Sequence, residues 1–285
     1  MNLRERLKQP EILVAPGCYD GLSAMLIEQA GFEAAYVSGA SVSYTRYGLP
    51  DIGLVGMSEM ADTVRALSQR ISLPLIVDGD TGFGNALNVQ RTVRAYGDAG
   101  AAAIQLEDQT FPKRCGHLDS KTLISTTAMA GKIRAAVDAR ASDDMLVIAR
   151  TDAVAVEGLA AALDRAEAYV DAGADMLFVE APPSTDALAE VGEKLGHRIP
   201  LMANMVEGGK TPLSSAADLQ ALGYSMVIFP GAFVRALTWM GQEFFGALRE
   251  HGTTRPYADR MHDFNSLNDV LGTPDFIARG HSYDE

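Results

Sequence analysis

Short apolar runs rich in β-branched residues alternate along the chain with longer stretches in which apolar residues recur every three or four positions. The short runs suit buried strands, and the longer stretches suit helices with one apolar face. The pattern predicts eight strands, at 12–15, 34–38, 73–77, 102–106, 145–149, 176–179, 200–203 and 226–229. Between them it predicts helices at 21–30, 58–69, 86–99, 127–139, 159–172, 185–195 and 214–222. Helix ends are predicted at the glycines that precede four of the strands, namely Gly31, Gly100, Gly173 and Gly223.

Eight strands that each lead into a helix are typical of a (β/α)8 barrel, whose strands are buried on both faces. A doubly wound open sheet shares the local pattern, but the strand count and the lack of Gly-x-Gly-x-x-Gly after the first strand favour the barrel. No linker divides the chain, so we predict a single barrel domain over 1–285. Aromatic helices at 232–251 and 257–271, followed by a polar tail, exceed what a barrel needs. We therefore expect 231–285 to be a C-terminal helical extension that packs on a partner subunit or on the barrel.

Composition narrows the class of protein. The net charge of −13 argues against a nucleic-acid surface, which needs clustered lysine and arginine. No run of about 18 apolar residues is present, so no membrane span is predicted. The mixed charge of the first residues does not resemble a secretory signal. Two cysteines make no disulfide framework, and a cytoplasmic location is expected.

Acidic residues follow the predicted strands at the end where barrel enzymes carry their chemistry. Asp78 and Asp80 stand two apart, so continued strand geometry would point both carboxylates to one side. A divalent cation such as Mg²⁺ would relieve their repulsion, although a solvated acidic turn has the same pattern. Asp51 and Glu107 come from neighbouring segments, and the four acids could share one cation. Arg150, after the fifth strand, would hold a substrate carboxylate through two hydrogen bonds.

A second candidate site lies in the loop after the fourth strand. Lys113, Arg114 and His117 flank Cys115, and positive neighbours are expected to lower the pKa of its thiol and ease proton exchange near neutrality. Gly116 allows the loop to bend, as a lid over a substrate requires. The plainer interpretation is an incidental surface thiol. The other cysteine, Cys18, is expected to be a semi-buried bystander.

Together these motifs resemble the isocitrate lyase/phosphoenolpyruvate mutase superfamily over roughly the whole chain. The matching segments are Val77-Asp-Gly-Asp-Thr-Gly-Phe-Gly84, Leu106-Glu-Asp108, Lys113-Arg-Cys-Gly-His117, Ala149-Arg-Thr-Asp152 with Glu157-Gly158 after it, and Tyr36-Val-Ser-Gly39. The segment around the cysteine is the most specific and indicates the carbon–carbon lyase branch, in which that cysteine is the catalytic acid.

The resemblance implies a (β/α)8 barrel that assembles as a homotetramer by exchange of a C-terminal helix. It implies a magnesium site, with Mn²⁺ as a substitute, at Asp51, Asp78, Asp80 and Glu107. It assigns catalysis to Cys115, Tyr36, Arg150 and His117. It assigns substrate binding to Ser38, Gly39, Ala40, Gly116, Glu180 and Asn204, where Ala40 replaces a glycine common in the family.

The implied reaction is a Mg²⁺-dependent retro-Claisen cleavage of a 2-hydroxy dicarboxylate. A base removes the proton of the C2 hydroxyl, the C2–C3 bond breaks, and Cys115 protonates the new carbanion. The base is either Tyr36 or a metal-linked water held by a carboxylate. The segment from Asn204 to Pro212 favours a 2,3-dimethylmalate- or citramalate-like substrate that yields pyruvate and a second acid. The alternatives are a 2-methylisocitrate lyase, which yields pyruvate and succinate, and an oxaloacetate hydrolase, which yields oxalate and acetate.

Overall fold

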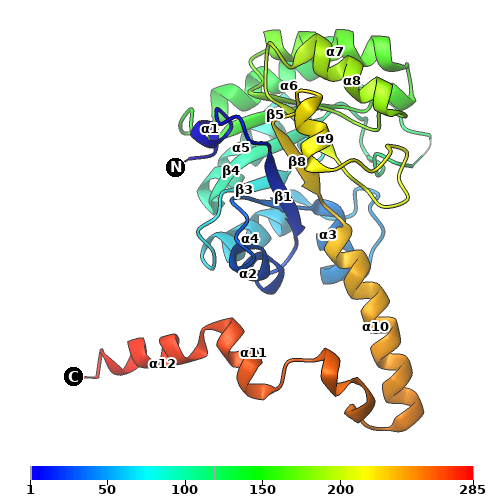
Figure 1. The fold of residues 1–285 in the computed structure, drawn as a ribbon. Helices are drawn as coiled ribbons and strands as arrows, with labels where there is room; N and C mark the ends of the chain where they lie inside the picture. The colour runs from blue at the N-terminus through cyan, green and yellow to red at the C-terminus, as the bar shows by residue number, and fades with distance from the viewer. Residues whose placement is uncertain (1, 119, 285) are drawn as a thin grey trace. The chain divides into compact units, whose positions relative to one another are not determined.

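Eight parallel strands form a closed barrel in this computed structural model, which describes residues 2–118 and 120–284 (Figure 1). Each strand pairs with the next in sequence, and β8 returns to β1, so no edge is left open. The barrel prediction is therefore confirmed over the open sheet. The strands are β1 Leu13–Cys18, β2 Ala35–Val37, β3 Leu75–Asp78, β4 Ala101–Glu107, β5 Leu146–Thr151, β6 Met176–Val179, β7 Leu201–Asn204 and β8 Met226–Phe229.

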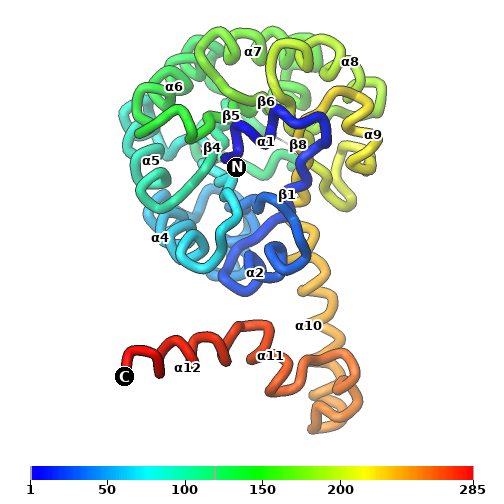
Figure 2. The backbone as a smooth tube through the Cα atoms, turned by 60° about the vertical axis from the view of Figure 1, so that its left-hand side comes forward, coloured from blue at the N-terminus to red at the C-terminus, as the bar shows by residue number. Residues whose placement is uncertain are grey.

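Helices surround the strands, as Figure 2 shows. Those that were predicted are present as α2 Gly21–Gln29, α4 Met57–Ser68, α5 Ala86–Ala99, α6 Thr126–Ala139, α7 Leu159–Asp171, α8 Thr185–Leu195 and α9 Ala216–Ala221. The glycines predicted to end helices have positive φ, between 83° and 102°. Four short segments were not predicted, because fewer than two turns show no periodicity: α1 Leu3–Arg6, α3 Gly39–Val42, the π-turn Ser43–Tyr47 and the 3₁₀ turn Ala153–Ala155.

The barrel interior is apolar towards the amino ends of the strands. Alternate strand residues, among them Leu13, Ile76 and Phe178, are at most 1% exposed and belong to one core cluster. Leu3 of α1 joins this cluster, and Figure 2 shows α1 lying across the ring of strands. Burying one such side chain contributes about 1.5–3 kcal/mol. The apolar floor closes one end of the barrel and leaves polar groups to the other.

The helices after β8 form part of a second compact unit. The chain divides into Met1–Phe233 and Val234–Glu285. The predicted helix 232–251 is confirmed as α10 Ala232–His251. The continuous helix predicted at 257–271 is wrong, since the 3₁₀ turn Arg255–Arg260 is followed by α11 Phe264–Leu271, which Asp263 caps.

The polar tail is also helical, as α12 Thr273–His281. Gly272, with φ 72°, ends α11, and Pro274 stands in the first turn of α12. Taking 231–285 as an extension of a single domain stays a prediction. Across the described residues, no helix combines the length and apolar character that crossing a membrane requires.

Candidate active site

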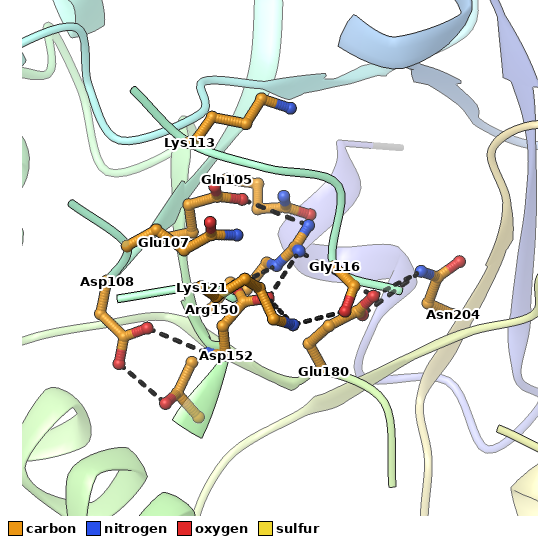
Figure 3. A network of polar contacts seen from close by, with 12 residues as sticks. Gln105, Glu107, Asp108, Lys113, Gly116, Lys121, Arg150, Asp152, Glu180 and Asn204 are labelled. Carbon is orange, nitrogen blue, oxygen red and sulfur yellow. Dashed lines mark hydrogen bonds and ion pairs between the residues drawn. The ribbon is translucent and has the colours of Figure 1, made fainter. Parts of the chain in front are cut away.

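The predicted site residues lie at the carboxyl ends of the strands, where β4, β5, β6 and β7 contribute to one network of polar contacts (Figure 3). Arg150 of β5 is at its centre. Its guanidinium donates two hydrogen bonds to Asp152, with Nε–Oδ2 2.9 Å and Nη2–Oδ1 3.0 Å. Its Nη1 lies 3.3 Å from Glu107 Oε2, and the group stands over the Phe178 ring, 5.2 Å from the centroid. Arg150 is thus fixed in place, and its Nη groups face Glu107 and Glu180.

Three of the four predicted metal ligands line one small cavity. Asp51, Asp78 and Asp80 border a space of about 10 Å³, enough for one water-sized guest. Asp78 and Asp80 meet at this cavity, but not through the alternation of strand side chains that was expected. β3 ends at Asp78, and Asp80 lies in the turn beyond it with φ 45°. A cation already lies among them, since Lys113 Nζ is 2.5 Å from Asp51 Oδ1 and 2.8 Å from Asp80 Oδ1.

Glu107, the fourth predicted ligand, stands at the end of β4 and is not among the residues that line this cavity. It is 1% exposed, and its Oε1 atom has no hydrogen-bond partner. Burial, opposed by Arg150, raises its pKa well above the ordinary range, and burial raises the pKa of Asp80 to about 6 despite Lys113. Within 2–118 and 120–284, no three acidic, histidine or cysteine side chains are gathered closely enough to bind a metal. The surplus of buried carboxylates and the orphaned oxygen nevertheless fit a cation that would displace Lys113.

The loop that carries Cys115 lies over this network. Its side chain is partly buried, and the charge of Lys113 is paired with Asp51 and Asp80. Burial and the charge of Asp51 raise the pKa of Cys115, with weaker opposition from the backbone of His117 and from Arg150. The expectation of a lowered thiol pKa is therefore wrong. The result suits a proton donor better, because the group remains a thiol at neutral pH.

The tip of the loop touches the barrel at Gly116 and His117. A Cβ atom at Gly116 would overlap Glu180 Oε1 and Arg150 Nη2. His117 Nδ1 accepts a hydrogen bond from the backbone N–H of Lys210 at 3.0 Å, so the ring proton belongs on Nε2, which lies 3.3 Å from Glu180 Oε1. Asn204 Nδ2 donates to Glu180 Oε2 at 3.3 Å. His117 thus ties the thiol loop to the loop after β7.

Gly116→Ala is expected to keep the thiol loop open, because the methyl group has no space against Arg150 and Glu180. Cys115 should then react with a small thiol reagent about tenfold faster or more. Mass spectrometry of the alkylated protein measures this rate. Gly131→Ala is the matched control, since a Cβ there has ordinary contact distances. Equal rates in Gly116→Ala and the parent protein would contradict the closed loop.

The predicted residues on β2 lie on the same rim. The Tyr36 hydroxyl donates to Gln105 Oε1 at 2.9 Å, and burial together with Asp78 raises its pKa well above the ordinary range. Tyr36 therefore keeps its hydroxyl proton near neutral pH, and a phenol that keeps its proton is poorly suited to act as a base. Ser38 caps α3, the short helix that contains Ala40, and a Cβ at Gly39 would come within 3.1 Å of Asp78 Oδ2. Gly39 thus lets the backbone approach the acids.

Four residues with clear positions in the site were given no role from the sequence. Gln105 connects Tyr36 to the acids, and as a polar residue inside an apolar strand it carried a usable signal. Asp152 holds Arg150, and the buried Asp108 holds Asp152 in turn by accepting from its backbone N–H at 2.9 Å. Lys121 also bonds Asp152, yet a lysine in a loop gives no sequence signal.

A parallel (β/α)8 barrel with acids, a buried arginine and a thiol loop at its carboxyl end is an enzyme fold with an enzyme site. The chain belongs to the phosphoenolpyruvate phosphomutase family, whose model matches residues 3–247. It is 42% identical to 2,3-dimethylmalate lyase of Eubacterium barkeri over 99% of this chain and 97% of that protein. It is 44% identical to 2-methylisocitrate lyase of Aeropyrum pernix, over 97% of this chain and 88% of that protein.

Solved structures agree with this assignment. A structure of oxaloacetate acetylhydrolase with the inhibitor 3,3-difluorooxalacetate has a TM-score of 0.94 and 34% identity, covering 99% of this chain and 96% of that one. One of 2,3-dimethylmalate lyase, a PEP mutase/isocitrate lyase superfamily member, has a TM-score of 0.92 and 37% identity, covering 99% of this chain and 94% of that one. Phosphonopyruvate hydrolase with oxalate and Mg²⁺ has a TM-score of 0.90 and 34% identity over 99% and 98%. The superfamily inferred from the motifs is confirmed.

Proposed function

We propose that this protein is a Mg²⁺-dependent carbon–carbon lyase that cleaves a 2-hydroxy dicarboxylate of the 2,3-dimethylmalate or citramalate type to pyruvate and a second carboxylic acid. The observation that carries the proposal is a thiol kept neutral by its surroundings, on a loop whose next residue lies against Arg150 and Glu180. The identity of 42% to a 2,3-dimethylmalate lyase, over nearly all of both chains, supports the choice of substrate. Oxaloacetate hydrolysis is the second candidate, favoured by the similarity to oxaloacetate acetylhydrolase.

The side chains of the site have distinct roles in this reaction. Arg150 orients the substrate's C1 carboxylate with the N–H groups that Asp152 leaves available. A base takes the proton of the C2 hydroxyl, and a water held by one of the acids is better suited to this than the protonated Tyr36. The C2–O bond then becomes a carbonyl while the C2–C3 bond breaks. The bonding pair remains on C3, and the Cys115 S–H donates its proton there. The loop covers the carbanion and excludes water, which would otherwise compete as a proton source.

Asp51, Asp78, Asp80 and Glu107 would hold the metal ion, directly or through water. Bound there, Mg²⁺ supplies positive charge that stabilises the negative charge developing on the C2 oxygen. The positive charge of the ion would be balanced by the buried carboxylates, one of which has an oxygen without a hydrogen-bond partner. Lys113 would leave Asp51 and Asp80 as the ion arrives. Phosphonopyruvate hydrolase with bound Mg²⁺, a structure with a TM-score of 0.90, supports this choice of metal.

A substrate panel tests the proposal. Purified protein with Mg²⁺ is assayed for pyruvate release from 2,3-dimethylmalate, citramalate and 2-methylisocitrate, and for oxalate release from oxaloacetate. Turnover of a methylmalate above the others supports the proposal. Faster turnover of 2-methylisocitrate or oxaloacetate transfers it to the corresponding alternative, and no turnover of any compound overturns the lyase assignment.

The raised thiol pKa sets a pH dependence. A proton donor works in its protonated form, so activity is lost as pH rises through the pKa of the donor. Because the pKa of Cys115 is raised above its usual value of 9.0, we expect the rate of the protonation step to hold through neutral pH and to fall only above that value. A pH–rate profile of kcat checks this. An alkaline limb that begins below neutrality would contradict the thiol as acid.

We also propose that the protein is cytoplasmic and assembles as a homotetramer with exchanged C-terminal helices. Large apolar side chains of the second unit support the assembly, since Trp239 is 69% exposed, Phe264 83% and Ile277 55%. Both cysteines are free, which suits a reducing compartment. Sedimentation equilibrium of the full chain tests the assembly, and a monomer would contradict it.

A further inference from the structure

Lys121 is a buried charge in the thiol loop that the mechanism above does not use. Its side chain is 1% exposed. Its ammonium donates to Asp152 Oδ1 at 2.9 Å and to the backbone carbonyl of Gly116 (Figure 3). A buried ammonium is retained only when its partners compensate for lost hydration. The two partners here are the tip of the loop and the carboxylate that holds Arg150.

The base of the loop is already fixed without this lysine. Gln109 and Leu123 form an antiparallel bridge, and the N–H of Thr110 donates to the carbonyl of Thr122 at 2.8 Å. Lys121 stands just inside this base, on the returning arm, and reaches to Gly116 beside Cys115. The contact therefore fastens the tip, the part that a fixed base leaves free to swing away.

Lys113 and His117 also hold the loop, and their contacts differ in kind from that of Lys121. Lys113 reaches Asp51 and Asp80, which are the acids that a metal ion would claim. His117 accepts a hydrogen bond from the backbone N–H of Lys210 and lies 3.3 Å from Glu180 Oε1, so its contacts involve an imidazole rather than an ammonium. Among the loop residues that the structure describes, only Lys121 joins a buried ammonium to a carboxylate outside the acidic cavity. This contact would thus persist when the metal site is filled.

The same carboxylate connects the loop to Arg150. Asp152 Oδ1 accepts from both Lys121 and Arg150 Nη2, at 2.9 and 3.0 Å. Burial opposes ionisation of Asp152, but Arg150 and Lys121 outweigh it and lower its pKa to about 2. Movement of the tip would break the contact between the Gly116 carbonyl and the ammonium that Asp152 binds. The position of the loop and the orientation of Arg150 thus both depend on Asp152 Oδ1.

We propose that Lys121 is a positioning residue that holds the Cys115 loop closed by joining the Gly116 carbonyl to Asp152, and so keeps the thiol in register with Arg150. Its catalytic meaning rests on the lyase function proposed above. The closure itself does not, because its contacts are made between residues of the chain and involve no substrate group. The two ideas can therefore fail separately.

The test is the rate at which a small neutral maleimide alkylates Cys115 in the full-length, substrate-free protein, followed by peptide mass spectrometry. Lys121→Met is expected to raise this rate about tenfold or more, close to the rate of Gly116→Ala. Loss of a nearby cation would by itself reduce the thiolate fraction and slow the reaction, so acceleration reports opening. Lys194→Met, which removes an exposed lysine on α8, should leave the rate unchanged.

Cys18 distinguishes local opening from unfolding, because it is 0% exposed and reacts only if the barrel opens. The proposal requires fast Cys115 and slow Cys18 in the same Lys121→Met sample, with Mg²⁺ affinity unchanged by calorimetry. If Cys18 also reacts, Lys121→Gln, which keeps a donor without the charge, is judged by the same criteria. A Cys115 rate within about twofold of the parent, while Gly116→Ala is fast, overturns the proposal. With a confirmed substrate, kcat should fall about tenfold while KM changes little.

Discussion

Cys115→Ser is expected to lower turnover of the proposed substrate by about 1,000-fold, the usual size of a general-acid contribution. A serine hydroxyl fills similar space but is a far weaker acid than a thiol, so protonation of the C3 carbanion becomes slow. The contacts that the structure gives Cys115 come from the backbone: the N–H of His117 lies against the thiol, and the N–H of Leu118 donates to the Cys115 carbonyl at 2.9 Å. Neither contact depends on a sulfur atom. Steady-state kcat, measured as pyruvate release, checks the loss.

The companion measurements separate acid catalysis from damage. Calorimetric Mg²⁺ affinity should be the same in Cys115→Ser and in the parent, because the acidic cavity does not include Cys115. Cys18→Ala is the matched control, since it removes the other cysteine, which is buried and lies outside the network. It should retain near-parental turnover. Residual activity of Cys115→Ser within about tenfold of the parent would assign the proton to another donor.

The barrel was predictable because each of its strands has a local signal. Eight apolar runs, four of them preceded by a glycine, alternate with amphipathic helices, and each run can be recognised from a few neighbouring residues. The structure has a barrel strand at every one of the eight runs. The segments that sequence reasoning missed, such as α3 and α12, are set by capping at Ser38 and by the turn at Gly272. Such ends depend on one or two residues, and periodicity does not detect them.

The sequence predicted which residues belong to the site better than it predicted their contacts. Asp78, Asp80 and Arg150 stand at or just beyond the carboxyl ends of strands, so topology alone brings them to one rim. The direction of Lys113 was not predictable, because its partner Asp51 is 62 residues away and only the folded barrel brings them together. The direction of the Cys115 pKa shift was predicted wrongly for the same reason. Nearness in sequence suggested positive neighbours, whereas burial and Asp51 dominate in space.

Asp80→Asn and Lys113→Met should change metal affinity in opposite directions. Asp80→Asn removes a carboxylate that borders the acidic cavity, and we expect Mg²⁺ affinity to fall by at least about 100-fold. Lys113→Met removes the ammonium that lies 2.5 Å from Asp51 and 2.8 Å from Asp80, a cation with which Mg²⁺ must compete. Affinity should then rise by about tenfold or more, since like charges at this separation repel by several kcal/mol. Titration calorimetry, repeated with Mn²⁺, measures both changes without any turnover.

Opposite signs at one cavity are a stricter test than a loss of activity, because most damaging substitutions weaken binding and few strengthen it. Asp62→Asn is the matched control, as it neutralises an exposed carboxylate paired with Arg65 on α4 and should leave the affinity unchanged. Without metal, Lys113→Met should also unfold at lower temperature, since its loss leaves buried carboxylates unpaired, and added Mg²⁺ should restore the difference. If both variants bound Mg²⁺ like the parent, the metal site would have to lie away from Asp51 and Asp80. A fall in both would instead make Lys113 a residue that shapes the site rather than one that competes for it.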